Sequence, residues 1–315
     1  MPELRVLVTC PPMQRTAHDW MDEFSSRGIE VELPAVIQQL TREELKGLLP
    51  AFDGMIAGDD PLDREVLAVA PRLRVISRWG VGMDNVDLDA ARDLGIRVTN
   101  TPAVFADEVA DVVLGYLLML SRRLHLIDQG VRAGSWPKLQ GISLRDRTLG
   151  IVGLGAIGRE VAKRGIGLGM RAVGYDADPV AQNIASEIGV EALDLEALLA
   201  RSDVISLNCP LTESNRHMIS TAALASMRPG AFLINTARGP LVDETALSEA
   251  LASGRLGGAA LDVFEEEPLP SSSPLRAFEN VILGAHNASN TAEAVKRTNE
   301  RAIANLFEGL ADGAG

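Results

Sequence analysis

The hydrophobic and polar positions of this chain alternate in the manner of α/β proteins. Short apolar runs are separated by longer stretches with helical spacing, which is the pattern of βαβ units and parallel sheets. In the first third of the chain, the runs predicted as strands are Arg5–Thr9, Ile29–Leu33, Gly54–Ala57, Arg74–Ser77 and Arg97–Thr99. The helices predicted between them are Thr16–Arg27, Thr41–Leu49, Asp63–Ala70 and Asp87–Leu94. These elements predict a doubly wound sheet.

A second set of alternating elements predicts another doubly wound sheet. Its strands are predicted at Leu149–Val152, Ala172–Tyr175, Val204–Asn208, Phe232–Asn235, Ala259–Val263 and Val281–Leu283. Its helices include Asp194–Arg201, Thr221–Met227 and Asp243–Ser253. Two long helical stretches, Asp107–Arg123 and Thr291–Leu310, flank this set.

The helix predicted at Thr291–Leu310 comes too late in the chain to belong to the second sheet. We therefore expect the chain to leave its first domain near Thr101 and to return near Ala285. Residues 1–101 and 285–315 would form one domain, and residues 102–284 would form a second domain inserted into it. The two crossings would act as a hinge, and a cleft between the domains would hold the ligands.

Composition and charge narrow the class of protein. A chain of 315 residues, 46% hydrophobic and 23% charged, is typical of a globular protein with two domains. Its net charge of −13 gives no reason to expect a nucleic-acid partner. Cys10 and Cys209 lack zinc-ligand spacing, so we expect no metal site and a reduced, cytoplasmic setting. The apolar run Val109–Leu120 is too short to span a bilayer, and the N-terminus lacks the pattern of a signal peptide.

Gly153, Gly155 and Gly158 have the spacing of a dinucleotide-binding loop and directly follow the apolar strand Thr148–Val152. In such a loop the first glycine allows a tight turn, the second admits a pyrophosphate, and the third permits close helix packing. Asp176 follows the next strand, where a carboxylate accepts the ribose hydroxyls. A glycine-rich turn of another α/β protein is the alternative, and the order of strand, loop, helix and acid argues against it.

A nicotinamide carries a hydride and needs a partner that moves a proton, for which histidine is the usual residue. Of the four histidines, His286 follows the predicted strand Val281–Leu283, where parallel sheets place their sites. His18 and His217 lie in polar stretches and are expected at the surface, and His125 could interact with a helix dipole. Taken alone, the position of His286 fits a structural role better than a catalytic one.

Two further segments favour a catalytic role for His286. Arg238 follows a predicted strand, where its guanidinium could bind a substrate carboxylate through two hydrogen bonds. Its alternative role is an ion pair with Asp243 or Glu244. The run Glu265–Glu267 would usually form a solvated loop, but one of its carboxylates could hold the imidazole proton and fix the tautomer.

Together these features resemble the D-isomer-specific 2-hydroxyacid dehydrogenases. The resemblance rests on the glycine loop, on the segments NTARGPLVDE from Asn235 and DVFEEEP from Asp262, and on His286, in that order. It covers essentially the whole chain. It implies an NAD-dependent oxidoreductase acting on CH–OH donors, in which a Rossmann NAD-binding domain is inserted into a flavodoxin-like substrate-binding domain.

The resemblance also implies roles for individual residues. His286 matches the catalytic acid/base, Glu267 its partner acid, and Arg238 the arginine that orients the substrate. The residues expected to bind substrate are Arg78, Val81, Gly82 and Arg238. The residues expected to bind NAD are Gly153, Gly155, Ala156, Ile157, Gly158, Asp176, Cys209, Pro210, Thr236, Ala237, Arg238, Asp262 and His286.

Asp176 also bears on the choice between NAD and NADP. Its carboxylate would accept the ribose hydroxyls and would repel a 2′-phosphate. The residues that follow, Ala177-Asp178-Pro179, offer no arginine that could bind such a phosphate. We therefore expect NAD as the cofactor.

The substrate is less clearly indicated. The segments Arg74–Asn85 and Gly134–Trp136 are similar to those of short 3-phosphoglycerate dehydrogenases, which offer a cation from the neighbouring subunit near the position of Lys138. Gly58–Asp60, in contrast, carries acids where these enzymes usually have an arginine, which would disfavour a phosphorylated substrate. Ala285 stands at a position where the family usually has proline. We expect hydride transfer between C2 of a D-2-hydroxy acid and NAD, with 3-phosphoglycerate as one candidate substrate and glyoxylate or hydroxypyruvate as alternatives.

A non-catalytic, NAD-sensing binding protein of the same fold is a second candidate function, because transcriptional corepressors resemble this family. No partner-binding tail or basic patch is visible, which argues against it. The helix Asp107–Arg123 and the loop through Trp136 resemble the dimerisation arm of the family. We therefore expect a homodimer formed through the NAD-binding domain, with neither a membrane nor nucleic acid as partner.

Overall fold

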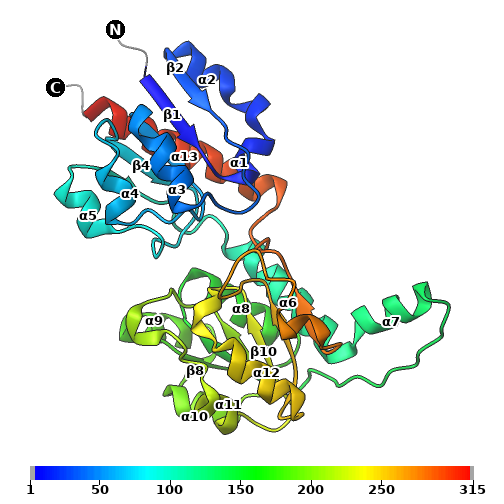
Figure 1. Cartoon of the computed structure of the whole chain (residues 1–315). Helices are drawn as coiled ribbons and strands as arrows, with labels where there is room; N and C mark the ends of the chain where they lie inside the picture. Colours follow the sequence, from blue (N-terminus) through cyan, green and yellow to red (C-terminus); the bar gives the residue numbers. More distant parts are fainter. Residues whose placement is uncertain (1–3, 313–315) are drawn as a thin grey trace. The chain divides into compact units, whose positions relative to one another are not determined.

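The computed structural model describes residues 4–312 and divides the chain into two compact units. The first unit combines residues 1–104 with residues 290–315, and the second comprises residues 105–289 (Figure 1). The chain therefore passes twice between the units. Each unit is built around its own parallel sheet.

The first unit contains a five-stranded parallel sheet. Its strands are β1 (Leu4–Val8), β2 (Ile29–Glu32), β3 (Gly54–Ala57), β4 (Val75–Arg78) and β5 (Arg97–Thr99). Their order is β2-β1-β3-β4-β5, which is the flavodoxin-like arrangement. The order reverses between β1 and β3, so the first unit has its topological switch point there.

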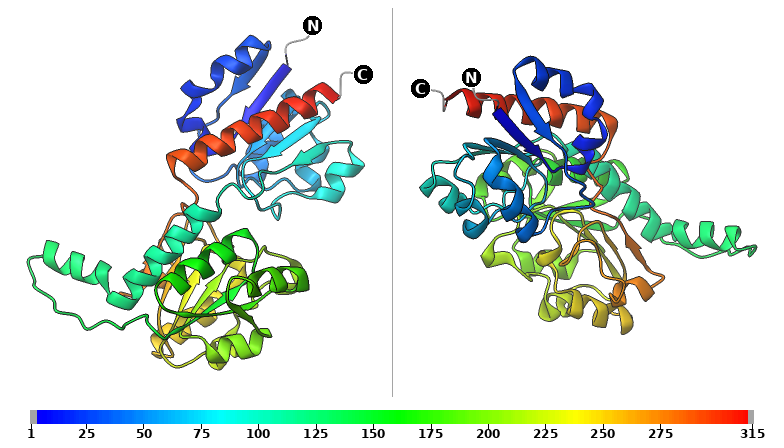
Figure 2. Two further views of the ribbon diagram at one scale, coloured as in Figure 1. Left: turned by 180° about the vertical axis from the view of Figure 1, so that it is seen from behind. Right: turned by 45° about the horizontal axis from the view of Figure 1, so that its top comes forward.

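The helices of the first unit are α1 (Pro11–Arg15), α2 (Met21–Ser26), α3 (Arg42–Leu48), α4 (Arg64–Ala68), α5 (Leu88–Asp93) and α13 (Ala292–Asp312). Four of them begin at capping side chains, those of Thr41, Asp63, Asp87 and Thr291. Helix α13, at the C-terminal end of the chain, packs against β3 and β4 (Figure 2).

The single helix predicted at Thr16–Arg27 is wrong. The segment instead holds Thr16, which caps the end of α1, a 3₁₀ turn at Ala17–Asp19 and the separate helix α2. Pro11 and Pro12 begin a helix earlier than predicted, since proline is suited to the first turn. That helix ends where the Thr16 hydroxyl donates a hydrogen bond to the Met13 carbonyl at 3.0 Å.

The second unit contains a seven-stranded parallel sheet in the order β12-β11-β10-β9-β6-β7-β8. Its strands are β6 (Thr148–Val152), β7 (Arg171–Tyr175), β8 (Val190–Ala192), β9 (Val204–Leu207), β10 (Ala231–Asn235), β11 (Leu256–Leu261) and β12 (Val281–Leu283). The first six strands follow the Rossmann order, which reverses between β6 and β9. Strand β8 is not predicted from the sequence, since only Val190 of its three residues is buried.

The helices of the second unit cover both faces of its sheet. They are α6 (Ala106–Arg122), α7 (Leu124–Arg132), α8 (Ala156–Gly167), α9 (Pro179–Ser186), α10 (Leu195–Arg201), α11 (Thr221–Ser226) and α12 (Glu244–Ala252). Side chains of α6 and α8 pack into one core with the sheet, and those of α10, α11 and α12 pack into the other. Among residues 4–312, no helix has the length and hydropathy that crossing a membrane would require.

Helix α7 differs from the other helices of the second unit. It was not predicted, none of its residues is buried, and it projects from the rest of the unit (Figure 2). Arg123, with φ 55°, joins it to α6. Leu124 and Val131 on this helix are 46% and 45% exposed, and Trp136 in the following loop is 79% exposed.

Candidate active site

The three motif glycines of the second unit have different structural roles. Gly153 has φ 92°, and a Cβ added there would lie 2.6 Å from the backbone nitrogen of Cys209. A Cβ on Gly158 would lie 1.9 Å from the carbonyl oxygen of Gly153, so both positions require glycine for packing. A Cβ on Gly155 would have no neighbour within 4 Å. Gly155 thus leaves room at the N-terminus of α8, as the approach of a pyrophosphate requires.

Asp176, just past the end of β7, is held beside the glycine loop. Its Oδ2 accepts a hydrogen bond from the Leu154 amide at 2.7 Å, and its Oδ1 accepts one from the Asp178 amide at 2.9 Å. Both oxygens are therefore fixed in direction. Cys209 follows β9 at the switch point of this sheet, and burial raises the pKa of its thiol to about 11. This cysteine consequently remains protonated at neutral pH.

The turn after β10 presents Arg238 and Thr236. The Asn235 side chain fixes this turn, because its Oδ1 accepts from the Ala237 amide and its Nδ2 donates to the Arg238 carbonyl, at 3.0 and 2.8 Å. The Thr236 hydroxyl is buried without a hydrogen-bond partner among the described residues. A buried hydroxyl with unmet hydrogen bonds suits a position that a polar ligand completes. The predicted contact of Thr236 with the cofactor fits this observation.

Asp262 follows β11, is 2% exposed and organises the turn that carries His286. Its Oδ2 accepts hydrogen bonds from the amides of Asn287 and Ala288 at 2.9 and 2.8 Å, and its carbonyl accepts from the His286 amide at 2.7 Å. His286 has φ 50°, an uncommon conformation for a residue other than glycine. The hydrogen bonds to Asp262 therefore hold His286 in a conformation that it would rarely adopt unaided.

Tyr116 on α6 completes the surroundings of Asp262. Its hydroxyl lies 3.2 Å from Oδ1 of Asp262. Burial and the charge of Asp262 raise the pKa of this hydroxyl above its usual range, so Tyr116 donates the bond. A Cβ added to Gly284 would lie 2.4 Å from the Tyr116 hydroxyl oxygen and 2.1 Å from Oδ1 of Asp262. Neither Tyr116 nor Gly284 is among the site residues predicted from the sequence.

His286 and Glu267 form a hydrogen-bonded pair. Nδ1 of His286 lies 2.7 Å from Oε2 of Glu267, and Oε1 of Glu267 accepts from the Phe264 amide at 2.9 Å. The two side chains are 25% and 15% exposed. Of the glutamates in the run Glu265–Glu267, the third is thus the one that contacts His286.

A second His–Glu pair lies in the same unit. The glutamate that starts the run, Glu265, pairs with His217, which the sequence analysis expected only to be at the surface. The amide of Glu265 also donates to Oε1 of Glu244 at 2.7 Å. Burial raises the pKa of Glu244, and the nearby glutamates add to this effect. His125 lies in α7, with Nε2 3.1 Å from the carbonyl oxygen of Glu279.

The predicted substrate residues of the first unit lie at the carboxyl end of β4. Arg78, the last residue of β4, is buried, and its guanidinium pairs with Asp59. In the turn that follows, Gly80 has φ 144° and donates its amide to the Thr101 hydroxyl at 2.9 Å. Val81 in this turn is 41% exposed. The hydrogen bond to Thr101 thus anchors the turn, while the exposed Val81 leaves it accessible to a ligand.

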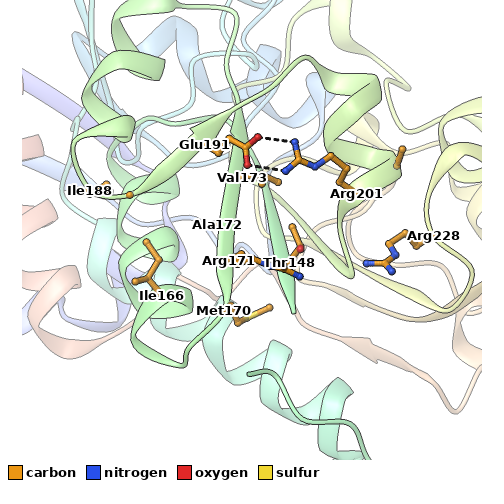
Figure 3. A pocket seen from close by; sticks show the side chains of 12 residues that line it. Thr148, Ile166, Met170, Arg171, Ala172, Val173, Ile188, Glu191, Arg201 and Arg228 are labelled. Atoms are coloured by element: carbon orange, nitrogen blue, oxygen red, sulfur yellow. Dashed lines mark hydrogen bonds and ion pairs between the residues drawn. The ribbon is translucent and has the colours of Figure 1, made fainter. Parts of the chain in front are cut away.

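A hollow of about 690 Å³ lies at the other edge of the second sheet, near the starts of β6 and β7 (Figure 3). None of the predicted site residues lines it. Its three arginines are already engaged. Arg201 makes two hydrogen bonds to Glu191, at 2.7 and 2.8 Å, and Arg228 pairs with Asp203. Arg171 donates to the Asp146 carbonyl at 2.9 Å. In the part of the chain that the structure describes, no group of three His, Cys, Asp or Glu side chains is arranged to hold a metal ion.

Comparisons with known proteins agree with this architecture. The NAD-binding domain of the D-isomer specific 2-hydroxyacid dehydrogenases matches residues 114–288. A glyoxylate reductase of Korarchaeum cryptofilum is 44% identical over 254 residues, which are 79% of this chain and 76% of the relative. The chain therefore belongs to the family of D-isomer specific 2-hydroxyacid dehydrogenases. The predicted fold, the NAD dependence and the family resemblance are confirmed.

Two further relatives show the range of the family. A D-3-phosphoglycerate dehydrogenase of Methanocaldococcus jannaschii is 39% identical over 93% of this chain, which spans only 55% of that protein. The structure of a D-lactate dehydrogenase of Aquifex aeolicus, solved with NAD and lactic acid, has a TM-score of 0.84. It is 30% identical and covers 98% of this chain and 96% of its own.

Proposed function

We propose that this protein transfers a hydride between C2 of a short D-2-hydroxy acid and NAD, with His286 as the acid/base. The observation that carries this proposal is the His286–Glu267 pair, 2.7 Å apart, in the unit that also holds the dinucleotide-binding loop. Glu267 fixes the imidazole of His286 through Nδ1, and we assign the proton exchange with the substrate to the other ring nitrogen, Nε2. The proposal extends the family's dehydrogenase activity to named residues of this chain.

Each residue of this pair has a separate task. In oxidation, neutral His286 accepts the proton of the substrate hydroxyl at Nε2. Glu267 fixes the tautomer through Nδ1 and stabilises the positive charge that the imidazole gains. Bound NAD supplies the hydride acceptor, and NADH supplies the donor in the reverse reaction. In reduction, protonated His286 returns its proton to the carbonyl oxygen of the 2-oxo acid.

The substrate carboxylate has two proposed partners. The planar guanidinium of Arg238 donates two parallel hydrogen bonds to the carboxylate oxygens. The amides of Val81 and Gly82 bind it as backbone donors, and the exposed position of Val81 supports this role. Arg78 is the fourth residue proposed to face the substrate.

The proposed cofactor contacts follow the same logic. The amides of Ala156 and Ile157 at the N-terminus of α8 bind the pyrophosphate, where the helix dipole favours negative charge. Asp176 accepts the ribose hydroxyls and disfavours NADP. Cys209 and Pro210 lie on the adenine side. Thr236, Ala237 and Asp262 contact the nicotinamide side.

We also propose that residues 285–315 and 1–101 bind substrate, that residues 102–284 bind NAD, and that the protein is a homodimer. The exposed apolar side chains of α7 and the following loop support a dimer, because a second copy would cover them. Sedimentation at micromolar concentration tests this, and a monomer there would refute it.

A substrate panel tests the proposed activity. Glyoxylate, hydroxypyruvate, pyruvate and the 3-phosphate ester of hydroxypyruvate would each be supplied with NADH. The matching 2-hydroxy acids would be supplied with NAD, as achiral glycolate and as the D and L isomers of the others. We expect turnover with at least one 2-oxo acid and a strong preference for the D isomer in oxidation. Tight NADH binding without turnover of any compound would instead support the NAD-sensing binding protein.

A further inference from the structure

The loop Gly58–Asp60 lies at the switch point of the first sheet. Thr9 directly follows β1 and Gly58 directly follows β3, the two strands between which the order reverses. The Thr9 hydroxyl bonds to Asp60, whose Oδ2 also accepts from the Gly58 amide at 3.0 Å. Ligands of open α/β sheets bind outside the carboxyl ends of the strands at such a point. The chemistry of this loop therefore bears on what the first unit binds.

Asp59 holds the guanidinium of Arg78 in place. The two side chains form an ion pair in which Arg78 is 5% exposed and Asp59 is 30% exposed. The second oxygen of Asp59 accepts a hydrogen bond from Gln38 at 3.1 Å, which fixes the carboxylate. Arg78 also donates to the Trp79 carbonyl, and a Cβ added to Gly80 would lie 2.8 Å from its Nη1. The guanidinium is thus folded against the backbone of its own turn.

The charge of this edge follows from these contacts. The positive charge of Arg78 is compensated by Asp59, and Asp60 adds a second carboxyl group beside it. Asp60 accepts a further hydrogen bond from the Leu40 amide at 2.9 Å, and burial raises the pKa of its carboxyl group. Together Asp59, Asp60 and Arg78 therefore carry no net positive charge. An incoming phosphate would have to displace Asp59 from Arg78 or remain next to two acids.

We propose that Asp59 is a specificity residue: by occupying Arg78, it selects 2-oxo acids whose group beyond C2 is uncharged and rejects those with a phosphate or sulfonate there. This inference rests on the proposed function. Like charges brought together at a binding site are a common means of excluding a competing ligand. The substrate is accordingly of the glyoxylate or hydroxypyruvate class, and 3-phosphoglycerate is excluded.

The test compares two substrates that differ only in the phosphoryl group: hydroxypyruvate and its 3-phosphate ester, each reduced with NADH. The measured quantity is the ratio of kcat/KM for the ester to kcat/KM for hydroxypyruvate, in which general losses of activity cancel. Wild type should have a ratio well below one. D59N, which removes one negative charge and keeps the shape, should raise the ratio roughly tenfold or more.

Asp63 provides the matched control. It also pairs with an arginine, Arg42, in the same unit, but both side chains are more exposed, at 36% and 59%. Asp63 caps α4 through the Val66 amide, a role that asparagine can also fill. D63N therefore removes the same charge without altering the switch point, and its ratio should equal that of wild type.

A variant of Arg78 completes a series in which the net charge of the Asp59–Arg78 pair is varied. R78Q leaves Asp59 uncompensated and should have the lowest ratio, whereas D59N exposes the guanidinium and should have the highest. The double variant D59N/R78Q is neutral, like wild type, and should lie between them. If R78Q fails to fold, the comparison of D59N with the double variant still tests the same order.

The outcomes separate this inference from the proposed function. Turnover of hydroxypyruvate with a ratio that D59N does not raise would overturn the specificity role of Asp59 and leave the proposed function standing. A wild-type ratio above one would do the same. Absence of turnover with every 2-oxo acid would overturn the proposed function, and the inference would fall with it.

Discussion

The two sheets of this protein use the same kind of edge in opposite ways. In the second unit, the switch point carries the glycine loop, where Gly155 leaves open space beside backbone amides at a helix start. In the first unit, the switch point is filled by carboxyl groups and a paired arginine. We therefore expect the edge of the first unit to suit an uncharged group and the edge of the second unit to suit a pyrophosphate. A shared fold thus sets where ligands bind, while a few side chains decide which ligand is accepted.

The largest effect is expected from removing the proposed acid/base. H286A should lower kcat by about 10²–10⁴-fold, the usual contribution of general acid–base catalysis, while NADH binding measured by fluorescence is retained. H217A is the matched control, since it removes the other histidine that pairs with a glutamate in the same unit. Equal losses in the two variants would mean that the His286–Glu267 pair has no special role.

The glycine loop gives the next largest effect, on stability rather than on chemistry. G158A places a methyl group 1.9 Å from the Gly153 carbonyl oxygen and should lower the unfolding free energy by about 1–3 kcal/mol. G155A meets no neighbour within 4 Å and should affect stability much less, but it should weaken NAD binding. Thermal unfolding and NADH titration of both variants separate the two roles. Similar melting temperatures for the two variants would contradict the packing argument.

Cofactor choice should respond more modestly. D176A should reduce the preference for NAD over NADP roughly tenfold, because a carboxylate no longer opposes the 2′-phosphate. A tenfold change corresponds to a free-energy difference of about 1.4 kcal/mol between the two cofactors. D178N removes a charge two residues away and keeps the cap on α9, so it should leave the preference unchanged. The ratio of kcat/KM for the two reduced cofactors is the measurement. An unaltered ratio in D176A would refute the ribose assignment.

Much of the second unit could be predicted because its signals are local. The glycine loop, Asp176 and His286 each lie next to a strand end, and the alternation of strands and helices is visible along the chain. The whole-chain motifs also led to the family, which the comparisons confirm. In the first unit the strands were predicted, but the ion pair between Asp59 and Arg78 was not.

The features that were missed depend on tertiary contacts. Tyr116 lies in an apolar stretch, and its partner Asp262 is 146 residues away. Gly284 is needed because two side chains occupy the space that a Cβ would take. Helix α7 buries none of its residues, so burial within this chain does not explain it. Such requirements arise only once distant segments have packed together, and no spacing in the sequence records them.

The Tyr116–Asp262 contact gives the smallest expected effect and the sharpest test of how His286 is positioned. Asp262 holds the turn of His286 through two backbone amides and its own carbonyl, and Tyr116 donates to the remaining side-chain oxygen. Y116F keeps the ring and removes only the hydroxyl. Because Asp262 retains its backbone donors, the loss in unfolding free energy should be about 0.5–1.5 kcal/mol.

The kinetic response distinguishes positioning from mere stabilisation. If Tyr116 orients Asp262 and thereby His286, Y116F should lower kcat several-fold at temperatures where the variant is still folded. The pH dependence of kcat should then shift as well. If Tyr116 serves only stability, Y116F should unfold at lower temperature with wild-type kcat at 25 °C. The variant therefore separates the two possibilities with a pH–rate profile and a melting curve. Tyr116 and His286 both lie in the second unit, whereas Asp59 lies in the first. The ratio of kcat/KM values that tests Asp59 should therefore not change in Y116F.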